Sequence, residues 1–179
     1  MSTTASTISE GAVGAVDAPV LEVLVVVASL SGNTRELGRM IAARCRQAGH
    51  RVHWHEADDL RQPPPLATAD ADLVLLGSWT DNGGRTPSEM KAWVAQQAEA
   101  GATLPHVAVF GTGETQWGLE YYCGAVHRLG RYFCSAYPPL QIEQMPHGQR
   151  HADLITAWTD EVLALHRSTA HADHRRHLA

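Results

Sequence analysis

A nearly continuous run of apolar, mostly β-branched residues at positions 21–27 constrains the fold of this chain more than any other segment. A strand of this composition needs cover on both faces, which is typical of a parallel sheet between helices. A short polar segment then leads into a helical pattern that we expect to run to about Ala48 and to end at Gly49. The sequence therefore predicts a β-strand, a tight loop and an α-helix as its first folded unit.

Strand and helix patterns alternate along the rest of the chain. We expect further strands at residues 51–56, 72–77, 106–110 and 139–143, and further helices at about 86–100, 119–134 and 152–166. Polar and apolar residues alternate in the second strand, which indicates one wet face and a place at an edge. The spacing predicts an α/β fold, a doubly wound five-stranded parallel sheet in the order 2-1-3-4-5 with helices on both faces.

The length of 179 residues and a hydrophobic content of 44% predict one folded domain. Residues 1–19 are mostly small and polar without a period, and we expect a disordered leader there. We expect the folded domain at residues 20–166. Residues 167–179, which contain several histidines and arginines, are expected to form a disordered tail without a metal site.

The charge and the cysteine content of the chain indicate which partners it can bind and in which compartment it acts. A net charge of −5 without a dense Lys/Arg cluster gives no basis for binding nucleic acid or an anionic membrane. No apolar run approaches the ~20 residues of a membrane span. The three cysteines lack C-x-x-C spacing, which indicates free thiols in a reducing compartment. We therefore expect a cytoplasmic protein with no nucleic-acid or membrane partner.

The loop after the first strand is the first candidate binding site. Its hydroxyls, its glycine and the free amides of a helix N-terminus suit one phosphate-sized anion. It has neither the G-x-x-x-x-G-K-[ST] pattern of a nucleoside triphosphate site nor the G-x-G-x-x-G pattern of a dinucleotide site. The alternative is an ordinary turn and helix cap. The loop consists of Ser29, Leu30, Ser31, Gly32, Asn33 and Thr34.

Two more loops of unusual composition follow the third and fourth strands. Each contains a tryptophan, Trp79 or Trp117, and the predicted strand order brings all three loops to one crevice. Trp79 either packs over its strand end or stacks on a flat ligand. Two tryptophans beside a phosphate site predict a slot for a planar, phosphate-bearing ligand, and FMN fits it. The other candidates are Ser78, Thr80, Asp81, Asn82, Gly83 and Gly84 in one loop and Gly111, Thr112, Gly113, Glu114 and Gln116 in the other.

Two segments of the chain resemble flavodoxin motifs. Residues 29–34 resemble the phosphate-binding [ST]-x-[ST]-G-N-T, and residues 111–126 resemble the G-x-G-D…F-C-G-A-V segment. The likeness spans about residues 21–165, and no long insertion splits the last strand, as in the short-chain group. It implies a flavodoxin-like fold, non-covalent FMN and one-electron transfer without substrate turnover. It also implies a flavodoxin/ferredoxin reductase as donor and a redox enzyme as acceptor.

The resemblance assigns roles to aromatic residues. It places Trp117 against the outer face of the flavin ring and Trp79 in the loop that supplies the inner-face aromatic. Compared with the usual spacing in short-chain flavodoxins, two extra residues separate Trp117 from Cys123, so that Tyr121 or Tyr122 can share or take over the stacking role.

Two further residues in or near the third loop, Cys123 and Glu114, have side chains that can take part in a reaction. Cys123 is expected to be a structural thiol buried beneath the flavin. Glu114 is either a catalytic acid or, as is more usual near a flavin, a carboxylate that hydrogen-bonds the loop.

Other functions remain open at this stage. The compact second loop is similar to that of the flavodoxin-like activators of manganese-dependent ribonucleotide reductase, in which asparagines stand at positions 114 and 116. An FMN-dependent reductase of small molecules such as quinones, and a binding module that has lost the flavin, are further alternatives.

Overall fold

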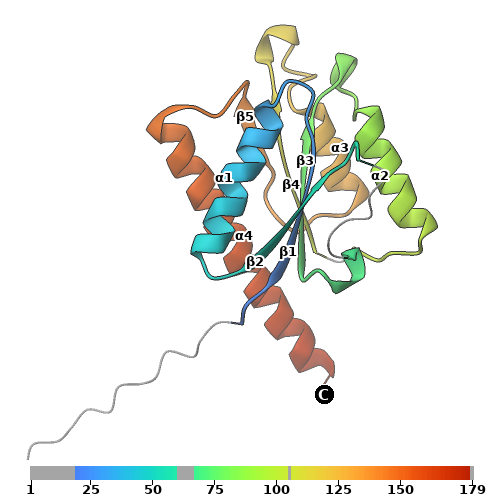
Figure 1. Cartoon of the computed structure of the whole chain (residues 1–179), viewed down its shortest axis with the longest axis vertical. Coiled ribbons are helices and arrows are strands. Elements are labelled where there is room, and N and C mark those ends of the chain that lie inside the picture. Colours follow the sequence, from blue (N-terminus) through green and yellow to red (C-terminus); the bar gives the residue numbers. More distant parts are fainter. Residues whose placement is uncertain (1–18, 60–66, 105, 178–179) are drawn as a thin grey trace, which may run out of the picture.

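The computed structural model describes residues 19–59, 67–104 and 106–177. Five parallel strands form one sheet in the order β2-β1-β3-β4-β5, which confirms the predicted topology. Helices α1 and α4 cover one face, and α2 and α3 cover the other (Figure 1). The elements are β1 (Glu22–Ala28), α1 (Asn33–Gln47), β2 (Arg51–Glu56), β3 (Leu73–Trp79), α2 (Ser88–Glu99), β4 (Val107–Gly113), α3 (Gly124–Tyr132), β5 (Leu140–Glu143) and α4 (Gly148–His177), with short 3-10 turns η1 (Thr68–Asp70), η2 (Asn82–Gly84) and η3 (Thr115–Trp117).

The composition of β1 explains its central position. Val23, Val25 and Val27 belong to the core cluster beneath α1 and α4. Leu24 and Val26 belong to the cluster on the opposite face, with α2 and α3. All five side chains are fully buried, so the strand stabilises both layers at once.

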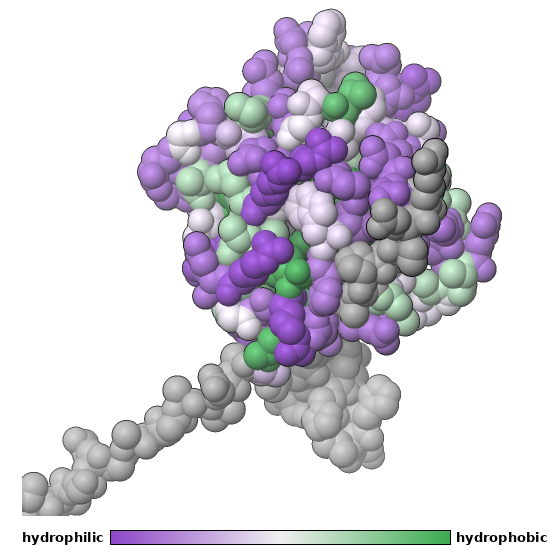
Figure 2. Space-filling model, in the orientation of Figure 1, coloured by the Kyte–Doolittle hydropathy of each residue, from purple (hydrophilic) through white to green (hydrophobic). Residues whose placement is uncertain are grey.

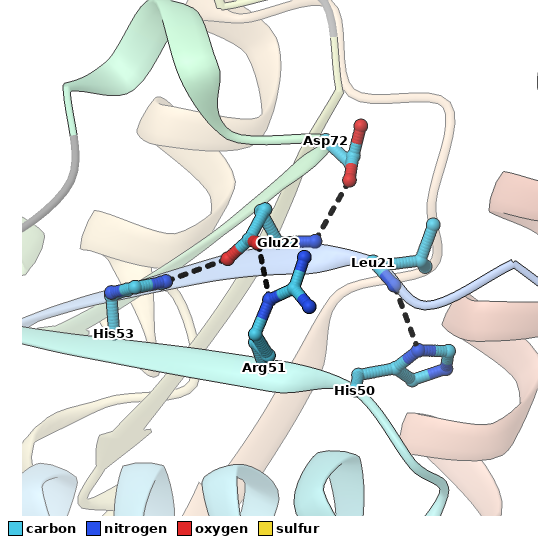
Figure 3. A network of polar contacts seen from close by, with 6 residues as sticks. All are labelled: Leu21, Glu22, His50, Arg51, His53 and Asp72. Carbon is cyan, nitrogen blue, oxygen red and sulfur yellow. Dashed lines mark hydrogen bonds and ion pairs between the residues drawn. The ribbon is translucent and has the colours of Figure 1, made fainter.

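A polar network joins the first residues of three strands (Figure 3). The Glu22 carboxylate pairs with Arg51 and lies 2.7 Å from His53 Nε2, and its pKa is lowered by the hydrogen bonds from His53 and Arg51. The Glu22 amide donates to Asp72 Oδ2 at 2.7 Å, and the Leu21 amide donates to His50 Nδ1 at 3.2 Å. These contacts align the starts of β1, β2 and β3.

Strand β2 lies at the edge of the sheet, as its alternating pattern predicts. The face of the molecule seen in Figure 1 carries mainly hydrophilic side chains (Figure 2). His55, which we expected on the wet face of this strand, is buried at 6% exposure, and burial lowers its pKa.

Several of the expected element boundaries are wrong. Strand β3 continues to Trp79, beyond the expected end at residue 77. Strand β4 continues to Gly113 because its parallel pairing with β3 extends through Gly111 and Thr112. Helix α3 begins at Gly124, not near residue 119, because Cys123 has a left-handed backbone with φ 47° that a helix does not allow.

Both ends of the C-terminal helix also differ from the expected residues 152–166, and the helix begins at Gly148. Helix α4 continues to His177 through most of the segment expected to be disordered, and its end projects away from the sheet (Figure 1). Residues 167–177 contain no glycine or proline to end it. The disorder expected at residues 1–19 concerns positions that, except residue 19, lie outside the described residues.

Candidate functional site

The three loops after β1, β3 and β4 meet at the carboxyl end of the sheet (Figure 1). Together they enclose a cavity of about 460 Å³, a size typical of sites for small organic ligands. Its position at the switch point of the strand order is where open α/β sheets bind ligands. The cavity is lined by Leu30, Ser31, Asn33, Trp79, Thr80, Asp81, Asn82, Gly83, Gly84, Thr112, Gly113, Glu114, Trp117, Tyr121 and Gln144.

The first loop presents backbone donors at the start of α1. Gly32 has φ 95° and turns the chain into the helix without a side-chain cap. No acceptor among the described residues pairs with the four amides of residues 31–34. Arg35, the nearest basic residue in the chain, is paired with Glu56 at 2.8 Å. The loop therefore offers neutral donors and the positive end of a helix dipole to an anion.

Two of the three hydroxyls predicted for this loop have partners within the protein. Ser29 Oγ accepts a hydrogen bond from the Arg35 amide at 3.2 Å, which leaves its own proton free to donate. Thr34 Oγ1 lies 2.7 Å from Thr112 Oγ1, and both side chains are buried. Because one of these two hydroxyls donates to the other, the pair retains one proton for a further acceptor.

The second loop is a tight hairpin. The backbones of Asp81 and Arg85 exchange hydrogen bonds of 2.9 and 3.0 Å around Asn82-Gly83-Gly84. Both glycines have positive φ, 68° and 73°, which this turn requires. The hairpin therefore presents backbone groups to the cavity in a conformation that residues with a Cβ rarely adopt.

Helix α3 holds this hairpin in place. Arg128 Nε donates to the Gly84 carbonyl at 3.0 Å, and the Ala125 amide donates to Thr80 Oγ1 at 3.3 Å. A Cβ at Gly124 would lie 2.4 Å from the Gly84 carbonyl oxygen, so glycine is required for this close approach. The second loop and the start of α3 thus form one rigid wall.

The third loop carries the most exposed aromatic side chain of the site. Trp117 is 71% exposed, and its indole N–H donates to Glu114 Oε2 at 2.9 Å. Gln116 Nε2 donates to the same oxygen, and the Thr115 amide donates to Glu143 Oε1 at 3.0 Å. Glu114 thus hydrogen-bonds its own loop, as expected for a carboxylate in this position.

Trp79 forms another wall, at the end of β3. It is half-buried against the core cluster beneath α2 and α3, and it also lines the cavity. Its indole N–H donates to Glu89 Oε1 at 2.7 Å. Part of the Trp79 surface therefore packs over its strand, which is one of the two expected alternatives, and another part faces the cavity.

Cys123 and Tyr122 lie behind the cavity wall. Cys123 is buried, and burial raises the pKa of its thiol to about 12, as expected for a structural cysteine. Burial also raises the pKa of Tyr122. Of the two tyrosines expected to share the stacking role, Tyr121 lines the cavity and Tyr122 does not.

The structure brings most of the predicted residues together, with Tyr121 among them, and it adds Gln144, which was not predicted. The Gln144 amide donates to the Gly113 carbonyl at 2.8 Å, beside the cavity. Gln144 could have been predicted from its position directly after the fifth strand, because the carboxyl end of that strand lies at the same edge of the sheet as the three loops. The predicted residues that do not line the cavity are Ser29, Gly32, Thr34, Ser78, Gly111, Gln116, Tyr122 and Cys123.

The donor set of the cavity fits FMN. Unpaired amides at one end suit a phosphate, and aromatic side chains with hairpin backbone groups suit a planar ring with a polar edge. Within the described residues, no group of three His, Cys, Asp or Glu side chains is arranged to hold a metal ion. No helix in this part of the chain is long and apolar enough to cross a membrane.

Known proteins agree with this description. The family model described as flavodoxin matches residues 25–134. A probable flavodoxin 2 of Bacillus subtilis is 32% identical over 139 residues, which cover 75% of this chain and 89% of the relative. A flavodoxin of Nitratidesulfovibrio vulgaris is 26% identical over 79% of this chain and 96% of its own.

A solved structure supports the fold. Oxidised flavodoxin 1 from Bacillus cereus superposes with a TM-score of 0.69 at 20% identity, over 80% of this chain and 97% of its own. The matches in sequence lead to one assignment: the chain belongs to the flavodoxin family, FMN-dependent proteins that carry electrons.

Proposed function

We propose that residues 29–34 bind the phosphate of FMN and that the flavin ring lies between Trp79 and Trp117. The observation that carries this proposal is the row of unpaired amides at the start of α1, which opens into a cavity with aromatic walls. Ser31 lines the cavity and has no hydrogen-bond partner among the described residues, so its hydroxyl is free to donate to the phosphate.

The chain's own groups then hold the ring. The hairpin of η2 presents backbone groups to the cavity, and its rigid attachment to α3 keeps them in position. Bound FMN supplies one-electron redox chemistry. The protein excludes water from the ring with Trp79, Trp117 and Tyr121, and Asp81 and Glu114 place carboxylates on the cavity wall. Negative charge at these positions disfavours the accumulation of further negative charge during reduction.

A comparison of FMN with riboflavin tests the phosphate site. Riboflavin lacks the phosphate, so the FMN-free protein should bind it far more weakly than FMN. Replacing Ser31 with alanine should cost about 1 kcal/mol or more of FMN binding, about fivefold in Kd, and leave riboflavin binding unchanged. Ser168→Ala, at an exposed position on α4, is the matched control. Equal affinity for FMN and riboflavin would show that the loop has been misassigned.

We also propose the electron donor and the compartment. A flavodoxin/ferredoxin reductase donates electrons, a redox enzyme accepts them, and the protein acts in the cytoplasm. The support for a protein partner is the exposed rim of the cavity, at which Trp117 and Leu30 are 71% and 74% exposed and accessible. The support for the cytoplasm is the set of three free cysteines. The test is reduction of the FMN-loaded protein by such a reductase with NADPH, followed by visible absorbance. Reduction by dithionite alone would reject this donor without affecting the FMN site.

A further inference from the structure

Both tryptophans of the cavity donate their indole N–H to a carboxylate. Trp79 Nε1 lies 2.7 Å from Glu89 Oε1, and Trp117 Nε1 lies 2.9 Å from Glu114 Oε2. Hydrogen bonds to an ionised acceptor are stronger and more directional than neutral ones. We propose that Glu89 and Glu114 are positioning residues that fix the two aromatic walls before FMN binds.

The two carboxylates lie in different parts of the fold, and each accepts a further hydrogen bond from a neighbouring side chain. Glu89 lies in the first turn of α2, where the helix dipole favours a negative charge, and Ser88 Oγ donates to its second oxygen at 3.3 Å. Glu114 precedes η3 and accepts from Gln116 as well as from the indole. Each tryptophan is therefore attached to a group that has a further contact.

The indole rings of Trp79 and Trp117 differ in how strongly their surroundings restrain them apart from the hydrogen bond to a carboxylate. Trp79 packs against the core cluster under α2 and α3, so Glu89 mainly sets the rotation of a ring that is already confined. Trp117 is 71% exposed and has little packing, so the bond to Glu114 is its main restraint. A ring that is free to rotate has to be ordered when the ligand binds, which weakens affinity. Loss of Glu114 should therefore weaken binding more than loss of Glu89.

The first test is NMR of the indole N–H groups in the FMN-free protein, which does not depend on the cofactor. The chain has five tryptophans, and single Trp→Phe variants assign their signals. Glu114→Ala should shift the Trp117 signal and speed its exchange with water, and Glu89→Ala should do the same for Trp79. Glutamine at either position keeps a neutral acceptor oxygen and should restore most of the wild-type behaviour. Glu120→Ala is the control, because Glu120 is exposed and the two indole N–H groups donate to other carboxylates.

The second test is FMN affinity, and this part depends on the proposed function. Glu114→Ala should weaken FMN binding about fivefold, Glu89→Ala less, and both glutamine variants less than twofold. If the wild-type protein binds no FMN, the proposed function fails while the NMR test still stands. If FMN binds normally and the Glu114→Ala variant behaves like the Glu120→Ala control in both measurements, the positioning role is refuted.

Discussion

The buried hydroxyl pair of Thr34 and Thr112 gives the sharpest test of how the phosphate loop is supported. The two oxygens lie 2.7 Å apart, and the side chains are 0% and 5% exposed. The pair links the start of α1 to β4, so it holds two of the three loops together. Thr34→Val preserves the side-chain volume but leaves the Thr112 hydroxyl without its partner.

The size of the effect follows from this burial. Leaving one hydroxyl of a buried pair unsatisfied costs about 1–3 kcal/mol, whereas replacing both with apolar groups of the same shape is nearly neutral. Each single valine variant should therefore lose about 2 kcal/mol. If the free energy of unfolding falls by about 2 kcal/mol per molar urea, a loss of this size lowers the urea concentration at the unfolding midpoint by about 1 M. The double variant should lose less than the sum of the single variants by about 1 kcal/mol or more.

Urea unfolding of the FMN-free protein measures these values without a contribution from the ligand. Thr159→Val is the control, because the buried Thr159 hydroxyl donates to the Ile155 carbonyl of its own helix, 2.7 Å away, and no side-chain partner is orphaned. We expect that variant to change stability by about 0.5 kcal/mol or less. A Thr34→Val variant as stable as this control, or strictly additive single and double variants, would refute a stabilising hydroxyl pair.

Three more predictions concern packing, pH and thiols. Gly124→Ala should destabilise the protein by about 1–3 kcal/mol in urea unfolding and weaken FMN binding, because its Cβ would lie 2.4 Å from the Gly84 carbonyl oxygen; unchanged values would refute this packing. Burial and then His106 lower the pKa of His166 from 6.5, so its contribution to stability is present above pH 6.5 and is lost as the pH falls through the lowered pKa. Urea unfolding between pH 7.5 and 5.5 should show this loss, and a His166→Gln variant with the same pH dependence would contradict it. Cys134 is the exposed member of the three free thiols, so one equivalent of a thiol reagent should react in the native protein and three in urea; rapid reaction of a second native thiol would refute this burial.

Much of the site was predictable because parallel strands put their carboxyl ends at one edge of a sheet. Once the apolar runs fix the strand order, the loops after β1, β3 and β4 must meet, and the predicted tryptophans must lie near each other. Glu89 was not predicted, because it lies ten residues beyond Trp79 on α2 and is joined to it only by the packing of that helix. Gln144 was missed for a similar reason, since the loop after β5 reaches the cavity only by pairing with β4.

Contacts between distant segments also explain why the expected start of helix α3 was wrong. Helical periodicity around residues 119–134 describes the side chains of α3 but not the left-handed backbone at Cys123, which is set by contact with neighbouring loops. The sequence likewise suggested three hydroxyls for the phosphate. Only the structure shows that Thr34 is buried against Thr112 and that Ser29 accepts a bond from the start of α1.

By itself, the sequence determined the layers, the strand order and the place of the cavity, because these depend on hydrophobic patterning and on the handedness of connections. The tertiary structure decided which side chains line the cavity and which support its walls. Those roles depend on contacts of a few ångströms between segments distant in the chain, such as Arg128 with Gly84 and Thr34 with Thr112. Local sequence patterns do not encode such distances, since they arise only when the helices pack on the completed sheet.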